Sequence, residues 1–276
     1  MFACGNVTYE YDGTLDGFFC CVFESFQKKE TPLGIHAMHA PQLTLGPVRS
    51  IHTDLKKAGR VRRGICQKLS REALWLVENV YLSFLEQKEL YMLQFLQQGF
   101  SIGADILRCL ADDTVSILLK AQRHLLNESH RYKQFIRFSA SGQVLASIIQ
   151  PRNQVLPLIA PHFTDRYSGE AFLIYDATHG MALVYRPGQS AIVPVDSFVM
   201  EAPDKEEQLY RDLWCEYYDA IAIKERYNPK CRMAHMPKRY WDVMTEFCNR
   251  RKPDFSKQGA KNSGAGNQTN ALSKRF

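Results

Sequence analysis

Residues 135–150 read FIRFSASGQVLASIIQ, and residues 171–188 read AFLIYDATHGMALVYRPG. Each stretch holds two short runs rich in β-branched and aromatic residues, and a turn signal around Gly142 or Gly180 separates them. Such runs favour strands because branched and aromatic side chains fit a half-buried pleated surface. Each stretch therefore predicts a β-hairpin.

A short helix is expected between the two hairpins. Leu156, Ile159 and Phe163 recur at helical spacing and so share one face. Together the elements predict a β-β-α-β-β block over about 135–186, in which a small antiparallel sheet packs against helices. The expected fold class is α+β.

Outside this block the pattern is mostly helical. Apolar residues keep helical spacing over about 14–133, and Thr14, Asp54 and Ser70 are suited to cap helices at their N-termini. Residues 31–50 contain three prolines and two glycines, which predicts a connecting loop.

The domain prediction follows from these patterns. We expect C-terminal helices over about 204–248, after a sheet block that extends to about 200. The chain would then form one α+β domain over 1–248. Beyond it, the Gly/Ser/Asn/Lys composition of residues 249–276 cannot bury apolar area, so a disordered basic tail is expected there.

The net charge of +6 comes from 35 basic and 29 acidic residues among 276. Residues 249–276 hold seven basic residues and one acid, so this tail carries the whole excess. The overall composition is that of a globular protein and excludes a fibre, a membrane channel or a fully disordered chain. Total charge therefore does not by itself make the body of the protein a nucleic-acid binder.

Eight cysteines are scattered along the chain without a CxxC pair or a Cys/His array. Because structural zinc and iron–sulfur centres need closely spaced ligands, we expect no metal and no cofactor. The adjacent Cys20 and Cys21 lie in an apolar run and are expected in the core. With no signal peptide and no apolar run of membrane-spanning length, we expect a cytoplasmic protein with no membrane partner.

Four residues are weak candidates for an active site. His162 and Arg166 are four residues apart on one helical face, and Asp176 precedes a turn in the second hairpin. With Asp12 of the YDG turn they would form an acid–base or anion-binding cluster if the fold brings them together. The competing interpretation is structural: an Arg166–Asp176 ion pair, a buried helix face ending at His162, and Asp12 as a turn residue.

Charge is segregated along the body of the chain. Residues 49–71 hold eight basic residues and one acid, and the basic segment 224–239 holds six and one. Between them, the acidic segment 201–219 holds seven acids and two bases. Clustered Lys and Arg favour phosphate backbones because binding releases counterions. The two oppositely charged segments are equally suited to pair with each other.

The basic segment and the residues just after it also interleave aromatic rings that are suited to stack on bases. Its alternative is structural, because Tyr240 and Trp241 begin rows at helical spacing, one of which would be core. The candidate nucleic-acid-binding residues are Lys224, Arg226, Asn228, Arg232, Lys238, Arg239, Tyr240 and Trp241.

Four stretches resemble one known family over about residues 7–248. They are YDGTLDGFFCCVFESF (11–26), TDLKKAGRVRRGI (53–65), PHFTDRY (161–167) and LWCEYYDAIAIKERYNPKCRMAHMPKRYWDVMTEF (213–247). The family is largely bacterial, biochemically uncharacterised and associated with DNA metabolism or DNA repair. Its members are commonly encoded beside a radical S-adenosylmethionine (radical SAM) protein, and a similar domain occurs fused to uracil-DNA-glycosylase-like proteins.

The resemblance implies a DNA-metabolism or repair accessory protein that binds DNA, a radical SAM partner, or both. One alternative is an enzyme acting on a nucleotide or damaged base through the His/Arg/Asp cluster. Another is a protein-binding scaffold without direct DNA contact, using a face such as 201–219. The glycosylase portion itself is absent from this chain, so uracil excision by this chain alone is not expected.

Overall fold

The computed structural model describes residues 2–38, 46–141, 144–200 and 202–248. The chain divides into two compact units, which we call the N-terminal unit (Met1–Pro203) and the C-terminal unit (Asp204–Phe276). Each is described separately below. The prediction that residues 1–248 act as one domain stays a prediction, and the predicted tail at 249–276 lies outside the described residues.

The N-terminal unit begins with two parallel sheets rather than with helices. Strands β1 (Ala3–Cys4) and β3 (Glu30–Thr31) pair in parallel. Strand β2 (Thr8–Tyr11) lies between β4 (Gly34–Ala37) and β5 (Val48–Ser50), parallel to both.

The expectation of a mere connecting loop at 31–50 is therefore wrong. It contains β4 and β5, which are too short and too close to Pro and Gly to show a periodic pattern. They are strands only because β2 supplies hydrogen-bonding partners on both sides.

Helices cover these small sheets, as the sequence predicts. They are α1 (Leu15–Lys28), α2 (Leu55–Lys68), α3 (Arg71–Tyr81), α4 (Lys88–Ile102), the short 3-10 helix η1 (Ala104–Arg108) and α5 (Asp113–Phe135). The predicted caps are confirmed, because Thr14, Asp54 and Ser70 each accept a hydrogen bond from a backbone N–H of the first turn. Cys20 and Cys21 are buried in the core beneath them, also as expected.

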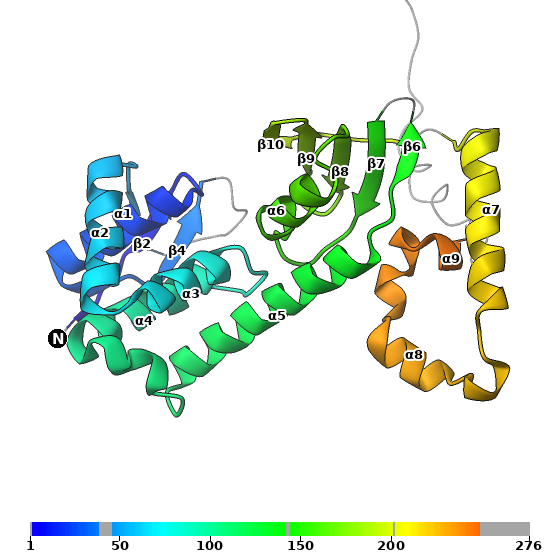
Figure 1. Ribbon diagram of the computed structural model, residues 1–276. Helices are drawn as coiled ribbons and strands as arrows, with labels where there is room; N and C mark the ends of the chain where they lie inside the picture. Colours follow the sequence, from blue (N-terminus) through cyan, green and yellow to red (C-terminus); the bar gives the residue numbers. More distant parts are fainter. Residues whose placement is uncertain (1, 39–45, 142–143, 201, 249–276) are drawn as a thin grey trace, which may run out of the picture. The chain divides into compact units, whose positions relative to one another are not determined.

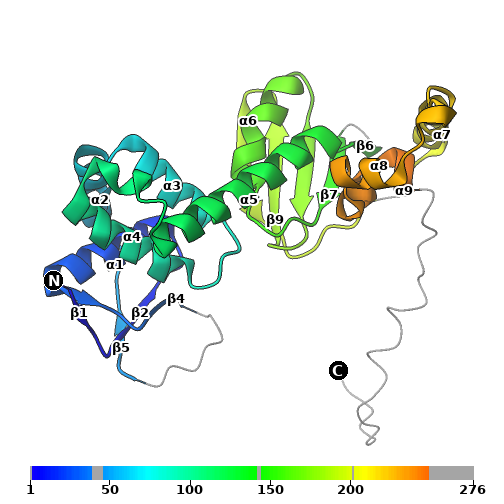
Figure 2. The ribbon, with the colours of Figure 1, turned by 90° about the horizontal axis from the view of Figure 1, so that it is seen from below.

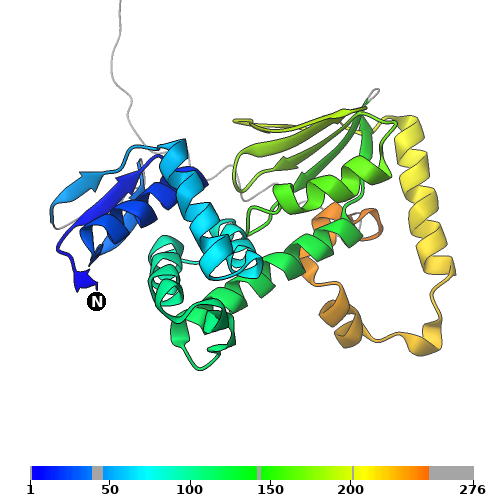
Figure 3. The ribbon, with the colours of Figure 1, turned by 60° about the vertical axis from the view of Figure 1, so that its left-hand side comes forward.

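The second half of this unit is a five-stranded sheet in the order β10-β9-β8-β7-β6. Its elements are β6 (Ser139–Ser141), β7 (Val144–Ile149), the helix α6 (Leu156–Arg166), β8 (Phe172–Asp176), β9 (Met181–Arg186) and β10 (Gln189–Pro194). Figure 3 shows α6 lying along one face of the sheet with α5 on its far side, and α5 packs against α6.

This sheet is mixed, so the prediction of a purely antiparallel sheet is wrong. Both predicted hairpins are present, but β7 and β8 are parallel. The reason is the intervening helix: α6 carries the chain back along the sheet, so that the next strand starts at the same edge as the previous one. Strand β10, antiparallel to β9, lies beyond the block of about 135–186 that the sequence predicted.

The C-terminal unit is helical and has a small core. It consists of α7 (Lys205–Ala220), η2 (Lys224–Arg226), α8 (Pro229–His235), η3 (Lys238–Val243) and α9 (Thr245–Cys248), of which Figures 1 and 2 show α7, α8 and α9 in two views. Neither α7 nor α8 contains a fully buried residue. The largest buried side chains are Tyr240, Met244 and Phe247, which follow one another at helical spacing.

Among the described residues, no helix is both long enough and apolar enough to cross a membrane.

Candidate functional site

A groove of about 600 Å³ lies within the C-terminal unit, and we call it the C-terminal groove. It is bounded by the end of α7, by η2 and by α8. The lining includes Arg226, Tyr227, Asn228, Arg232 and His235. The fold of this stretch is local: Asn228 caps α8 by accepting a hydrogen bond from the Cys231 N–H at 3.0 Å, and Pro229 occupies the first helical turn.

Arg232 is the most constrained cation of the C-terminal groove. Its guanidinium carbon lies 5.6 Å from the ring centre of Tyr227, 5.6 Å from that of Trp241 and 5.5 Å from that of Phe247. Its Nε atom is buried and has no hydrogen-bond acceptor among the described residues. Arg232 therefore holds a positive charge against an aromatic floor, with one N–H donor unsatisfied by the protein.

Three other cations of the basic segment are open to solvent. Arg226, Lys230 and Lys238 are exposed, and in the described part of the chain none of the three forms an ion pair. The acidic helix α7 instead pairs Glu207 with its own Arg211 at 2.8 Å. At these three positions, then, the acidic segment does not neutralise the basic one.

Three of the predicted nucleic-acid-binding residues line the C-terminal groove, namely Arg226, Asn228 and Arg232. Lys238 and Arg239 are exposed on η3, outside the lining. The amide oxygen of Asn228 is already occupied by the cap of α8, so this residue shapes the groove more than it offers an acceptor to a ligand. The side chain of Lys224 lies outside the described part of the chain.

The two predicted stacking residues need correction. Tyr240 is 0% exposed and belongs to the core, so its ring is closed to a base. Trp241 is half-buried: its ring stacks on Phe247 at 4.6 Å, and its Nε1 donates to the Met236 carbonyl at 3.0 Å. The rows that begin at Tyr240 and at Trp241 thus both contribute to packing, because η3 is too short to expose one of them.

Tyr227 is the aromatic residue that this part of the site offers instead. It is 69% exposed and lies in the lining of the C-terminal groove, beneath the guanidinium of Arg232. The sequence contained one indication that Tyr227 would be exposed, which is its position just before Asn228-Pro229. A residue outside regular helix, just before Asn-Pro, has no helical row to bury it.

Asp12 is a turn residue whose carboxylate is bonded to its own turn and to the segment before α2. Its carboxylate accepts hydrogen bonds from the Thr14 N–H at 2.9 Å, the Thr14 hydroxyl at 2.7 Å and the Thr53 hydroxyl at 2.6 Å. Partial burial acts to raise the pKa of Asp12, but the bonds from Thr53 and Thr14 outweigh it and hold this pKa below its usual value. This geometry fits the turn interpretation. Through these bonds Asp12 joins β2 and α1 to the start of α2.

His162 and Arg166 do not meet Asp176. Helix α6 ends beside the start of β8, where the ring of Tyr167 lies 6.2 Å from that of Phe172. Asp176 is the last residue of β8, at the opposite end of the strand, and its carboxylate contacts His179 Nδ1 at 2.6 Å. The predicted cluster and the alternative Arg166–Asp176 ion pair both fail, because the helix runs antiparallel to the strand that follows it.

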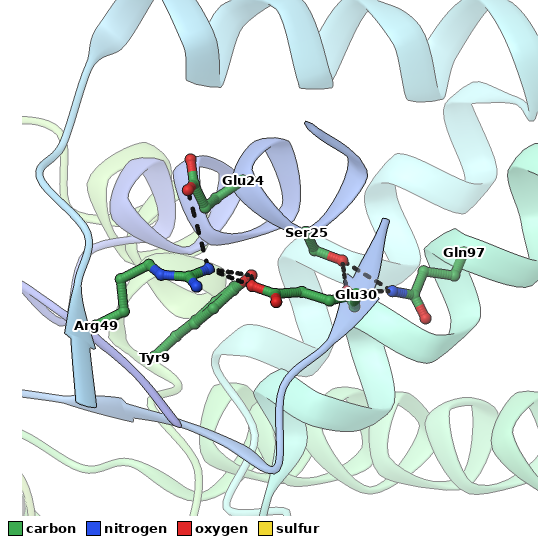
Figure 4. Close-up of polar contacts among 6 residues, drawn as sticks. All are labelled: Tyr9, Glu24, Ser25, Glu30, Arg49 and Gln97. Carbon is green, nitrogen blue, oxygen red and sulfur yellow. Dashed lines mark hydrogen bonds and ion pairs between the residues drawn. The ribbon is translucent and has the colours of Figure 1, made fainter. Parts of the chain in front are cut away.

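A denser polar cluster lies where β2, β3, β5, α1 and α4 meet (Figure 4). The side chains drawn there are those of Tyr9, Glu24, Ser25, Glu30, Arg49 and Gln97. Glu30 accepts from the Tyr9 hydroxyl at 2.7 Å and from Arg49, which lowers the pKa of the Glu30 carboxyl.

Gln97 completes the cluster by donating to the Ser25 hydroxyl at 2.8 Å. These groups satisfy one another and hold three short strands and two helices together, so we assign this cluster to stability rather than to ligand binding.

The chain belongs to a protein family whose model matches residues 86–246, more than half of its length, and which is described as a domain of unknown function (DUF4130). The matched range contains the whole C-terminal groove and the five-stranded sheet. No curated protein and no solved structure matches the chain. In the described residues, no group of His, Cys, Asp or Glu side chains is arranged to hold a metal ion.

Proposed function

We propose that the protein is an accessory protein of DNA metabolism or DNA repair that binds DNA through the basic segment of its C-terminal unit. The observation that carries this proposal is the exposure of Arg226, Lys230 and Lys238 without an ion pair among the described residues. Had these cations been paired with the acidic segment, the charge would have been structural.

The parts of the site would act differently on the nucleic acid. Arg226, Lys230 and Lys238 are suited to phosphate contacts, which provide affinity without reading sequence. The exposed ring of Tyr227 is suited to stack on an unpaired base at the edge of the C-terminal groove. Arg232, held on its aromatic floor, brings a positive charge into the lining of the C-terminal groove, where it is suited to attract a phosphate.

The test is DNA binding by the full chain at increasing salt, compared with an Arg226→Glu/Lys230→Glu double variant. Each lost phosphate contact lowers the salt slope of log K by about 0.9 on duplex DNA. We therefore expect a slope reduced by about 2 and weaker binding to all sequences alike.

The matched control is Lys205→Glu/Arg186→Glu, which changes the charge equally at exposed positions outside the basic segment. Both doubles keep the basic tail, so its contribution cancels in the comparison. An equal loss in the two doubles, or no DNA binding by the parent chain even near about 50 mM salt, contradicts the proposal.

A second candidate function is supported by α7. Its exposed large apolar side chains form one stripe along the helix, which continues at the capping residue Ile221; within α7 they are Leu209, Tyr210, Leu213, Trp214 and Tyr217. A stripe of this kind on an ordered helix is typical of a protein-binding surface. We propose that it docks a partner protein, for which the radical SAM protein implied by the family resemblance is the first to test.

The experiment is a pull-down of that partner with and without DNA. Leu213→Glu/Tyr217→Glu, which interrupts the stripe, is expected to abolish capture while the DNA affinity stays unchanged. Capture that persists in this variant would show that the partner docks elsewhere.

A further inference from the structure

A second groove, of about 380 Å³, lies in the N-terminal unit between α1, α2 and α4, and we call it the α2 groove. Its apolar part is made by the rings of Phe23, Phe26 and Phe100, all three half-buried. The rings of Phe26 and Phe100 meet edge to face with 5.0 Å between their centres. Only its α4 wall lies within the residues matched by the family.

Three cations of α2 stand over these rings, and two of them, Arg60 and Lys68, line the α2 groove. Lys57 Nζ is 5.4 Å from the ring centre of Phe23, and the Arg60 guanidinium carbon is 5.5 Å from the same centre. Lys68 Nζ is 5.7 Å from the ring centre of Phe100. The three cations follow one another at i, i+3 and i+11 on one face of α2, so the helix itself sets their spacing.

Most of the charge on this helix is not neutralised by the residues that the structure describes. Helix α2 holds six basic residues and no acid. Arg62 pairs with Asp16 at 3.3 Å and with Glu78 at 3.1 Å, but it lies away from the α2 groove. Lys57, Arg60 and Lys68 make no ion pair with any residue that the structure describes.

We propose that the α2 groove binds a single strand of nucleic acid, with a base inserted among the phenylalanine rings and the flanking phosphates on Lys57, Arg60 and Lys68. The proposal goes beyond the C-terminal site, because it rests on different residues in the other unit. Stacking of a base on an aromatic ring is stronger than a cation–π contact at an exposed site. An entering base therefore displaces the cations from the rings toward its phosphates.

The residues select this occupant over others. A run of unpaired cations at helical spacing needs a polyanion, which excludes an uncharged apolar peptide. The rings lie in a groove between helices, so only a base outside a duplex stack reaches them. Gly64 leaves this part of the wall without a side chain, and a Cβ there would touch the Phe100 ring at an ordinary contact distance of 3.6 Å.

The experiment measures binding of a 15-nucleotide oligothymidine, alone and paired in a duplex, to full-length protein carrying Arg226→Glu/Lys230→Glu. In this background we expect the single strand to bind more tightly than the duplex. Adding Arg60→Glu/Lys68→Glu is expected to weaken single-strand binding about tenfold or more. Lys56→Glu/Arg63→Glu changes the charge of the same helix equally, but outside the groove lining, and is expected to cost about threefold or less.

A second measurement reports the position of the base. Oligothymidine in which one base is 5-iodouracil is irradiated with the protein, and the cross-linked peptide is identified by mass spectrometry. We expect cross-links at Phe23 or Phe100, and their loss in Phe23→Leu or Phe100→Leu, which keep an apolar side chain but no ring. Circular dichroism of each variant verifies that the fold is retained.

The outcomes separate this inference from the proposed function. Equal losses in the two α2 double variants, or cross-links confined to the C-terminal unit, overturn the α2 groove and leave the C-terminal site standing. Free thymidine monophosphate is added as a competitor. If it competes as well as the oligonucleotide at the same nucleotide concentration, the inference is also overturned, since the occupant would then be a free nucleotide. Binding that survives Arg226→Glu/Lys230→Glu unchanged but fails with Arg60→Glu/Lys68→Glu supports the α2 groove and contradicts the proposed function.

Discussion

In the α2 groove the cations lie outside a large apolar core, whereas in the C-terminal groove the half-buried Arg232 packs directly against core side chains. Helix α2 is held in place by buried Ala58, Val61 and Ile65, and its Lys and Arg side chains lie on other faces. In the C-terminal unit α7 and α8 bury no residue fully, and Arg232 packs against Trp241 and Phe247 instead.

The difference shows where a cation can serve ligand binding alone and where it also contributes to stability. A large apolar core lets surface cations vary freely, so the charge of α2 is available for a ligand. A small core recruits the aliphatic stem and the flat guanidinium of an arginine as packing material. Binding residues can be changed cleanly in the α2 groove, but in the C-terminal groove they must be chosen among those that carry no packing.

The largest effect is expected at Glu128, a buried side chain of the N-terminal unit whose carboxyl group accepts several hydrogen bonds. This side chain is 3% exposed and accepts from the Arg152 N–H at 3.2 Å and from the Asn153 N–H at 2.9 Å. Glu128→Ala would leave buried donors without an acceptor and lower the free energy of unfolding by about 4 kcal/mol. Urea denaturation followed by circular dichroism measures this, and a loss below about 1 kcal/mol would contradict it.

Arg232 is expected to show the next largest effect, and it tests the comparison directly. Arg232→Ala removes a guanidinium from three aromatic rings and should lower the stability of the C-terminal unit by about 2 kcal/mol. Arg60→Ala in the α2 groove should change stability by about 0.5 kcal/mol or less, because that side chain is exposed. Limited proteolysis and tryptophan fluorescence of the two variants decide it. Equal effects would mean that the two grooves are built alike.

A smaller effect, and a stabilising one, is expected from substitution of Gln122. The residue is 8% exposed, and its buried Nε2 atom has no acceptor among the described residues. Gln122→Met has a similar shape and removes the unsatisfied donor, so it should stabilise the N-terminal unit by about 1 kcal/mol. Thermal unfolding measures the gain, and a destabilised Gln122→Met would show that the amide has a partner in solution.

The smallest effect is a pH dependence at His162. Burial, followed by the nearby Lys133 and Arg166, lowers the pKa of this imidazole below its ordinary 6.5. Folding therefore disfavours the protonated ring, and stability falls as the pH drops through 6.5 toward the folded pKa. His162→Gln should flatten the melting temperature between pH 7 and 5, roughly the range over which histidine titrates. An unchanged profile would assign the dependence to other groups.

Much of the fold followed from local patterns. The caps at Thr14, Asp54 and Ser70, the helical stripes and the two hairpins all rest on interactions between residues close in sequence. Strands β4 and β5 could not be predicted in this way, because their hydrogen bonds go to β2, which is distant in sequence. The parallel pairing of β7 with β8 likewise depends on where α6 returns the chain.

The candidate site divides in the same manner. The sequence identified the cations of the basic segment, since clustered charge is a local property, and three of them are exposed as DNA binding requires. It could not tell which rings are free, because burial is a property of packing. Tyr240 is in the core while Tyr227 is exposed. His162 and Arg166 lie on α6, which ends beside the start of β8, whereas Asp176 lies at the other end of that strand.

By itself, then, the sequence determined the charge segregation, the helix starts and the α+β class, because each arises from neighbours within a few turns of chain. The tertiary structure decided the direction of the strands, the rings that remain open and the cations left without partners. Those features depend on residues far apart in sequence meeting at one surface, and in the N-terminal unit that meeting gathers Phe23, Arg60 and Phe100 into one groove.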